Sequence, residues 1–313
     1  MNEPVSEPRV VHPPKTTVVT TVDVENDAKR RELSPNRLAV RRFLRNPPAV
    51  IGLAVLAIIT LASVFAPFIS PFAPDAIDLG AIRQPPSAEH WLGTDSTGRD
   101  VLSRLLSGGR VSLAVGFLAA FLAVTTGTLL GVIAGWYGGA IDAVISRVID
   151  IMLTVPPILV VIVLAGIIGP NVTLLILVIA GLSWPGSARI ARGVVLGLRE
   201  QEFVQAAGVL GSKSWFVIRK HLLPGVLPPV VVAATLLVAE AVLLESALSF
   251  LGAGVQPPQS SWGNMLTEAQ SLTVLSSMPW LWIPAGTVIA LTVLSAMSAG
   301  DGIRDAIDPR KNR

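Results

Sequence analysis

Five long segments without an acidic or basic residue dominate this sequence. They are Asn46 to Pro74, Val111 to Ile141, Ile151 to Ala188, Leu222 to Ala239 and Leu272 to Gly300. A helix needs about 20 apolar residues to cross the hydrocarbon core of a bilayer, which is about 30 Å thick. The third segment is too long for one crossing, and Gly169-Pro170-Asn171 interrupts it with turn-forming residues, so we expect a hairpin of two helices there.

Six membrane crossings follow from these segments. We expect them near residues 48–69, 111–135, 146–168, 172–193, 226–251 and 280–302. The composition agrees, because 51% of residues are hydrophobic, only 14% are charged and the mean hydropathy is +0.65. We predict an all-α membrane protein in three parts. These are a disordered cytoplasmic tail (1–35), an N-terminal region with the first transmembrane helix and an external loop (36–110), and a core domain with five more transmembrane helices (111–309).

The positions of Lys and Arg predict the orientation of the chain. If the N-terminus lies inside, the inner segments hold most of the basic residues, and the outer segments hold only Arg83, Arg99, Arg104 and Arg110. Cytoplasmic loops of membrane proteins are enriched in Lys and Arg. We therefore expect both termini to be cytoplasmic.

Several kinds of chemistry are excluded by the residue types. Cysteine is absent and only three scattered histidines occur, which excludes thiolate metal sites and makes a histidine metal cluster improbable. The basic residues form no stripe with interleaved aromatics, so we expect no nucleic-acid binding. Residues 93–100 superficially resemble a phosphate-binding loop but lack its lysine and follow no strand. We predict no catalytic residue, metal or cofactor in this chain.

Local patterns inside the predicted spans give three further expectations. Pro156-Pro157 predicts a kink. Arg147 and Asp150 are three residues apart on a helix and should form an ion pair. Three glycines recur every fourth residue in the second span, which places them on one face where another helix can approach closely, unless they are merely tolerated by a membrane helix. They are Gly127, Gly131 and Gly135.

The longest cytoplasmic loop, residues 199–224, predicts a helix, a turn and a second helix. An apolar stripe follows helical spacing over Phe203, Ala206, Ala207 and Leu210. Gly211 suits the left-handed position that ends a helix, and Ser212 is a candidate cap for the next one. A short amphipathic helix of this kind either docks against a partner protein or lies in the lipid interface.

Two carboxyl groups fall within the fifth span, where ionised side chains are costly and usually face a cavity or a partner. Glu240 and Glu245 are five residues apart, about 140° around a helix, and cannot share one face. We treat both as candidates for lining a translocation path and favour Glu240. For Glu245 the alternative is a structural role, with an Arg side chain or backbone amides as its partner.

The loop motif and other segments resemble a known family. Gln205-Ala206-Ala207, Gly211 and Leu223-Pro224 have the spacing of the EAA motif of binding-protein-dependent ABC import permeases, with Gln205 in place of Glu and His221 in place of Ile. HWLGTDSTGRDVLSRLLSGGRVSL (90–113) and LSFLGAGVQPPQSSWG (248–263) resemble signatures of C-type subunits of dipeptide and oligopeptide permeases. Together with the first span, the resemblance covers residues 37–309.

The resemblance implies a type I ABC importer fold with a cytoplasmic coupling helix, in the cytoplasmic membrane of a bacterium. It implies a heterodimer with a B-type permease subunit, two ATPase subunits and an extracytoplasmic solute-binding protein that delivers the ligand. The loop around Gln205 to Gly211 would be the coupling helix seated in a groove of one ATPase, and the ATPase subunits hydrolyse the ATP. Peptides are the substrate expected by family, although the same group also includes subunits for nickel, glutathione and some sugars.

Two other classes of function are weighed against this one. A secondary transporter could carry a proton on Glu240 or Glu245, but we find no paired halves with broken helices, which that class usually has. A membrane-embedded enzyme would need a cluster of His, Cys or acidic side chains spaced for catalysis, and none occurs.

Overall fold

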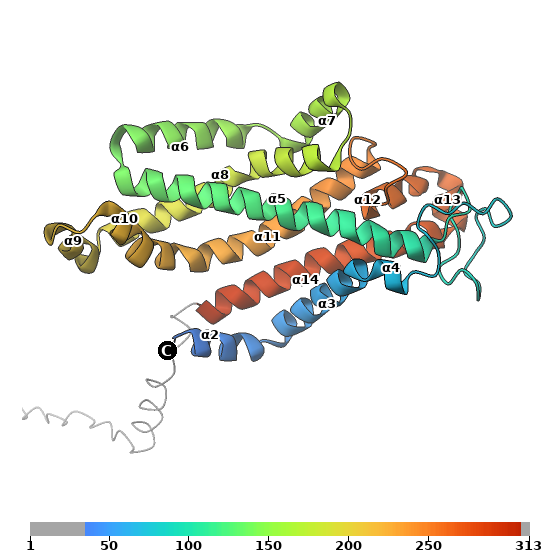
Figure 1. Cartoon of the computed structure of the whole chain (residues 1–313), viewed down its shortest axis with the longest axis horizontal. Coiled ribbons are helices and arrows are strands. Elements are labelled where there is room, and N and C mark those ends of the chain that lie inside the picture. The colour runs from blue at the N-terminus through green and yellow to red at the C-terminus, as the bar shows by residue number, and fades with distance from the viewer. Residues whose placement is uncertain (1–34, 308–313) are drawn as a thin grey trace, which may run out of the picture.

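The computed structural model describes residues 35–307, and within that range the chain is built from helices. Five helices are long and apolar enough to cross a membrane, and a bent pair of shorter helices supplies a sixth crossing if it is counted as one span. Figure 1 shows the long helices side by side along the longest axis of the molecule. The predicted all-α membrane fold is confirmed. Residues 1–34 of the predicted tail (1–35) lie outside the described residues, as do residues 308–313 at the other end of the chain.

The first span is α3 (Pro47–Val64), preceded by α2 (Pro35–Leu44) and followed by the short α4 (Ala66–Ile69). The Asn46 side chain accepts a hydrogen bond from the Ala49 amide and caps the start of α3. This helix lies at the edge of the bundle, where it packs on the last helix and on α5. Its outward residues, such as Ile51 and Ile58, are largely exposed, as lipid-facing side chains should be.

The second span, α5 (Val101–Tyr137), begins ten residues before the predicted start. The Asp100 side chain caps it by accepting from the Ser103 amide at 2.7 Å. Arg110 reaches the open end of α3, donating to the Ser63 carbonyl at 3.0 Å and to the Val64 carbonyl at 2.6 Å. Arg110, one of the charged residues that placed this stretch outside the membrane, is therefore used to satisfy the end of α3.

The third span is broken. Helices α6 (Gly139–Thr154) and α7 (Pro157–Ile168) differ in direction by 79°, which confirms the kink predicted at Pro156-Pro157. The predicted ion pair between Arg147 and Asp150 is wrong, because Asp150 accepts from Arg189 of the fourth span at 2.9 Å. The partner across the helix interface is better placed than the one on the same helix.

The fourth span, α8 (Val172–Arg199), packs along α5 over most of its length. Asn171 of the predicted turn caps its start by accepting from the Thr173 amide at 2.7 Å. The three glycines predicted to allow a close helix contact, Gly127, Gly131 and Gly135, face this helix. A Cβ atom on Gly131 would lie 2.8 Å from the Ala191 Cβ and closer still to the Ala188 carbonyl oxygen, and one on Gly135 would lie 2.8 Å from the Val195 Cβ. Contact this close leaves no room for a side chain.

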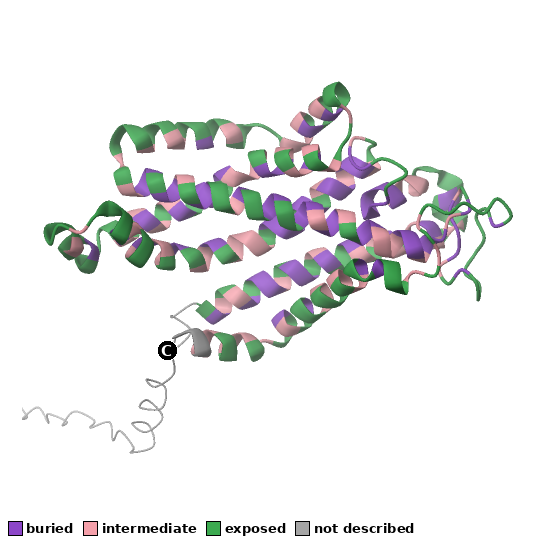
Figure 2. Cartoon of the chain, viewed as in Figure 1, coloured by how far each residue is buried: buried purple, intermediate pink, exposed green. Residues whose placement is uncertain are grey.

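The remaining elements follow in chain order. They are α9 (Glu202–Val209), α10 (Ser214–Val217), the π-helical turn η1 (Ile218–Leu222), α11 (Leu223–Phe250), α12 (Trp262–Met265), η2 (Leu266–Gln270), α13 (Leu272–Ser277), η3 (Pro279–Leu281) and α14 (Ile283–Ile307). Helices α11 and α14 are the fifth and sixth spans, and both pack on each other. Figure 2 shows buried residues along the facing sides of α5, α11 and α14 and exposed residues on α6 and α9.

Candidate functional site

The helix α9 lies at one end of the bundle, far from the loops at the other end (Figure 1). The described N-terminal helix α2 and the end of α14 lie toward the same end as α9. Residues 73–100, α12 and α13 form the opposite end, which we call the outer cap, residues 73–100 and 251–282. The topology expected from the basic residues places α9 at the inner end.

The turn after α9 has the geometry expected from its glycine. Gly211 has φ +74°, a left-handed conformation that a residue with a side chain rarely adopts. The Gly211 amide donates to the Gly208 carbonyl at 3.0 Å, and the Ser212 amide donates to the Ala207 carbonyl at 3.0 Å. These bonds satisfy the last carbonyl groups of the helix. The next helix begins after Lys213, whose side chain makes no cap, so the expected cap at Ser212 is wrong.

The predicted apolar stripe is partly buried against the bundle and partly exposed. Val204 is 3% exposed and, with the half-buried Ala207, packs into a core cluster that includes Val195 and Leu222. The sequence interpretation omitted Val204, although its three-residue spacing from Ala207 was a usable signal. Phe203, Ala206 and Leu210 point away from the bundle, with Leu210 84% exposed and Val209 89% exposed. One side of α9 therefore anchors the helix, and the other is apolar and uncovered in this chain.

A groove of about 380 Å³ lies at the base of α9. Trp136, Tyr137, Arg199, Val204, Gln205 and Gly208 line it. The Arg199 guanidinium donates to the Trp136 carbonyl at 3.3 Å, and the Gln205 amide group donates to the Glu200 carbonyl at 3.3 Å. These two side chains join α9 and its entry turn to the ends of α8 and α5.

The segment after α9 forms a single helix with the fifth span. Residues Ser214–Phe250 run continuously through α10, η1 and α11, and no turn separates Leu223 and Pro224 from the preceding helix. The Leu223 amide donates to the Ile218 carbonyl, the wider spacing of a π-helical turn. His221 fills the space between two aromatic rings, with centroid distances of 5.7 Å to Phe203 and 6.1 Å to Phe216. Helix α9 is therefore joined to α11 through the turn at residues 210–213 and the continuous helix that follows it.

The two carboxyl groups of α11 lie in different surroundings. Glu240 is exposed, on a face that also carries the exposed Leu236 and Leu243. Glu245 is 0% exposed and accepts hydrogen bonds from Ser112 at 2.8 Å and Ser249 at 2.7 Å. The expected partner of Glu245, an Arg side chain or backbone amides, is therefore wrong, because hydroxyl groups take that place.

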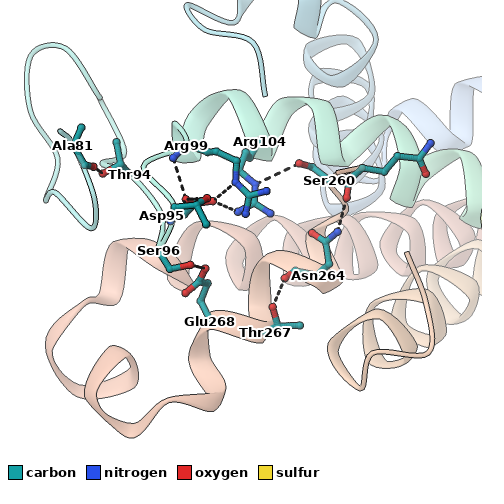
Figure 3. Close-up of polar contacts among 12 residues, drawn as sticks. Ala81, Thr94, Asp95, Ser96, Arg99, Arg104, Ser260, Asn264, Thr267 and Glu268 are labelled. Atoms are coloured by element: carbon teal, nitrogen blue, oxygen red, sulfur yellow. Dashed lines mark hydrogen bonds and ion pairs between the residues drawn. The ribbon is translucent and has the colours of Figure 1, made fainter. Parts of the chain in front are cut away.

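The outer cap is held by a buried ion-pair cluster (Figure 3). The Asp95 carboxylate accepts from Arg99 at 2.7 Å and also pairs with Arg104, which in turn donates to Ser260 at 3.4 Å. Burial alone would raise the pKa of Asp95, but Arg104 and hydrogen bonds from Arg99 and Thr97 hold it below the ordinary value. The segment that resembled a phosphate loop is thus the structural core of the cap.

No group of three or more His, Cys, Asp or Glu side chains within residues 35–307 could hold a metal ion. The described residues form an exposed apolar face on α9, a set of helices long and apolar enough to cross a membrane, and a packed outer cap. These are features of a membrane permease subunit.

Comparison with solved structures identifies the fold. The chain is similar to a subunit in the inward-facing conformations of the MetNI methionine ABC transporter, with a TM-score of 0.53 at 20% identity over 66% of this chain and 96% of that one. The fold is that of the membrane-spanning subunits of type I ABC importers.

Comparison with families and curated relatives then gives the family. Residues 127–313 match the binding-protein-dependent transport system inner membrane component family, and residues 34–86 match the N-terminal transmembrane domain of oligopeptide transport permease C. The chain is 41% identical to the dipeptide transport system permease protein DppC of Alkalihalophilus pseudofirmus, over 89% of this chain and 91% of that one. It is 42% identical to the oligopeptide transport system permease protein OppC of Haemophilus influenzae, over 87% and 88%. The chain belongs to the binding-protein-dependent transport system inner membrane component family.

Proposed function

We propose that this chain is the C-type permease subunit of a peptide importer in a bacterial cytoplasmic membrane. It pairs with a B-type permease subunit, and two ATPase subunits bind on the cytoplasmic side, where both termini lie. An extracytoplasmic solute-binding protein delivers a dipeptide or oligopeptide at the outer cap. The names of the DppC and OppC relatives support the substrate class. The division into an N-terminal region, residues 36–110, and a core domain, residues 111–309, is part of this proposal.

The uncovered apolar face of α9 carries the proposal. Phe203 near the start of α9, and Val209 and Leu210 where it ends, are exposed on a helix that has the spacing of the EAA motif. Exposed apolar side chains grouped in this way typically mark a protein interface. Gln205, Ala206 and Gly211 complete this surface. Ala207 packs into the bundle behind it, and Leu223 and Pro224 begin α11. We assign this surface to one ATPase subunit.

The continuous helix Ser214–Phe250 gives the proposal its mechanism. Docked α9 moves when the ATPase dimer closes on ATP, and its packing through Val204 and Ala207 against Leu222 carries the movement to the continuous helix. The exposed face of α11 that carries Glu240 lines the path together with the B-type subunit. Glu245 is closed off from that face in this conformation, so Glu240 is the better path residue of the two.

A reconstitution experiment tests the proposal. The chain is assembled with its B-type partner and ATPases in vesicles, and uptake of a labelled dipeptide is measured with and without ATP. Leu210→Asp should lower both ATPase copurification and uptake by more than about tenfold, because a charge is then desolvated at the interface. Leu272→Asp is the matched control, since Leu272 is 82% exposed on the outer cap, and its ATPase copurification should be unchanged.

Two outcomes would contradict the proposal. Normal ATPase copurification by Leu210→Asp would remove α9 from the interface. Uptake driven by a proton gradient without ATP, and abolished by Glu240→Gln, would favour the alternative, a secondary transporter.

A further inference from the structure

Glu245 has an unusual set of hydrogen-bond partners for a buried carboxyl group. Its side chain is 0% exposed, and the groups that donate to it are the hydroxyls of Ser112 at 2.8 Å, Ser249 at 2.7 Å and Ser246 at 3.4 Å. Ser112 comes from α5 and the other residues come from α11. A buried carboxyl group is costly unless it is well hydrogen-bonded, so these hydroxyls are needed to keep it there. The cluster joins the two helices.

The same hydroxyls hold the chain that follows α11. The Val255 amide donates to the Ser249 oxygen at 3.0 Å, and the Trp262 amide donates to the Ser112 oxygen at 3.1 Å. A serine hydroxyl has one hydrogen to donate and lone pairs to accept with. Ser112 and Ser249 each donate to Glu245 and accept a backbone amide. Two short relays therefore run from the Glu245 carboxyl to the backbone of residues 251–265, which we call the outer segment.

The outer segment sits directly on this cluster with no space between. A Cβ atom on Gly263 would lie 2.5 Å from the Ser246 carbonyl oxygen, and one on Gly108 of α5 would lie 3.1 Å from the Ser261 backbone. Trp262 is 1% exposed, and its indole NH donates to the Leu105 carbonyl at 3.0 Å. The backbone of the outer segment is therefore in direct contact with α5 and α11 at this position.

On its far side the outer segment meets the ion-pair cluster of the cap. Ser260 accepts from Arg104, and beyond the segment Glu268 accepts from Ser96 (Figure 3). The segment is thus fixed from outside by charges and from inside by Glu245. The inside contact joins it to α11, in addition to the backbone bonds from Gly252 to Ser249 and from Ala253 to Leu248.

We propose that Glu245 is a positioning residue that holds the outer segment closed against α5. Its carboxyl group orients the Ser112 and Ser249 hydroxyls, which then accept the Trp262 and Val255 amides. Without the carboxyl group, the Ser112 and Ser249 hydroxyls lose the acceptor that orients them and turn toward other acceptors. The Trp262 and Val255 amides then lose their own hydrogen-bond acceptors. The outer segment then opens locally while the inner half of the bundle stays folded. This proposal does not rest on the transported substrate.

Thiol reactivity tests the proposal. The sequence contains no cysteine, so a single introduced cysteine is the only thiol of this chain. Val255→Cys reports on the outer segment, since Val255 is 2% exposed in a core cluster with Leu248. Val195→Cys reports on the inner core, where Val195 is 0% exposed. The rate of reaction with N-ethylmaleimide is measured in the full chain in isolated membranes, first with each cysteine alone.

Adding Glu245→Ala should raise the Val255→Cys rate at least about tenfold and leave the Val195→Cys rate unchanged, because only the outer segment opens. Ser112→Ala, which cuts one relay, should give a smaller increase of about threefold. Glu245→Gln, which keeps one acceptor oxygen, should restore most of the protection. Glu240→Ala is the matched control on the same helix and should change neither rate.

Two results would overturn the proposal. The first is Val255→Cys protection that survives Glu245→Ala, since the carboxyl group would then not position the segment. The second is equal acceleration at Val255→Cys and Val195→Cys, since Glu245 would then support the whole bundle rather than the outer segment. If Glu245→Ala does not accumulate, the same two results obtained with Ser112→Ala would overturn the proposal.

Discussion

The close approach of α5 and α8 gives a quantitative prediction for Gly131→Ala. The new Cβ would lie 2.8 Å from the Ala191 Cβ, whereas carbon atoms in contact are about 3.5–4.0 Å apart. The Ala188 carbonyl oxygen, which is backbone, is closer still, so the helices must separate by about 1 Å. Overpacking of this kind costs about 1–3 kcal/mol, and the higher helix propensity of Ala returns at most about 1 kcal/mol. With the full return, we expect a net loss of stability of up to about 2 kcal/mol.

Gly193→Ala is the matched control for this prediction. Gly193 lies on α8, and a Cβ atom added there would meet nothing within 4 Å, so only the propensity gain applies and the variant should be equal to or more stable than the parent. The assay is denaturant unfolding of the purified full chain in detergent. The two glycine variants should differ by at least about 1 kcal/mol. Equal stabilities of Gly131→Ala and Gly193→Ala would contradict the prediction that the close contact of α5 with α8 requires glycine at position 131.

Two further predictions concern ion pairs. Asp95→Asn leaves Arg104 buried without its carboxylate and should destabilise the chain by about 3–5 kcal/mol in thermal or denaturant unfolding at neutral pH. Because the folded pKa of Asp95 is lowered, its contribution is present above the unfolded value of about 3.9 and is lost as the pH falls through the lower folded value. The difference between parent and Asp95→Asn should therefore shrink below about pH 4, and a difference independent of pH would contradict the assignment. Asp142→Asn breaks a half-buried ion pair with Arg192 that has two hydrogen bonds, and it should cost about 1 kcal/mol of stability. Asp150→Asn breaks the exposed pair with Arg189 and should cost at most about 0.5 kcal/mol in the same unfolding assay. A larger cost for Asp150→Asn than for Asp142→Asn would contradict the argument that burial strengthens the pair.

The membrane crossings could be predicted from sequence because the bilayer imposes one strong rule: long charge-free segments become spanning helices. The rule fails where a charge is satisfied by the protein itself. Residues 101–110 were predicted to be a loop because they carry Arg104 and Arg110. Arg104 pairs with Asp95, and Arg110 donates to the last carbonyls of α3, so both charges are accommodated in a helix.

The candidate site was predicted in outline and not in detail. Gly211 and the helix before it follow from local turn and spacing rules, which need only neighbouring residues. The inward face of α9, where Val204 and Ala207 pack, depends on α8 and η1, which sequence periodicity does not place. The partners of Glu245 were missed for the same reason, because Ser112 is distant along the chain and only the packing of α5 on α11 brings it there.

We propose that an ATPase subunit moves this chain through its contact with α9. The most direct measurement places a photo-crosslinking amino acid at Leu210, which is 84% exposed, in the full complex in native membranes. The control site is Leu79, which is 77% exposed in the outer cap. We predict a crosslink from Leu210 to an ATPase subunit that weakens or shifts when ATP is added, and none from Leu79. The absence of a crosslink from Leu210, or its labelling by an impermeant reagent added from outside the cell, would contradict the account.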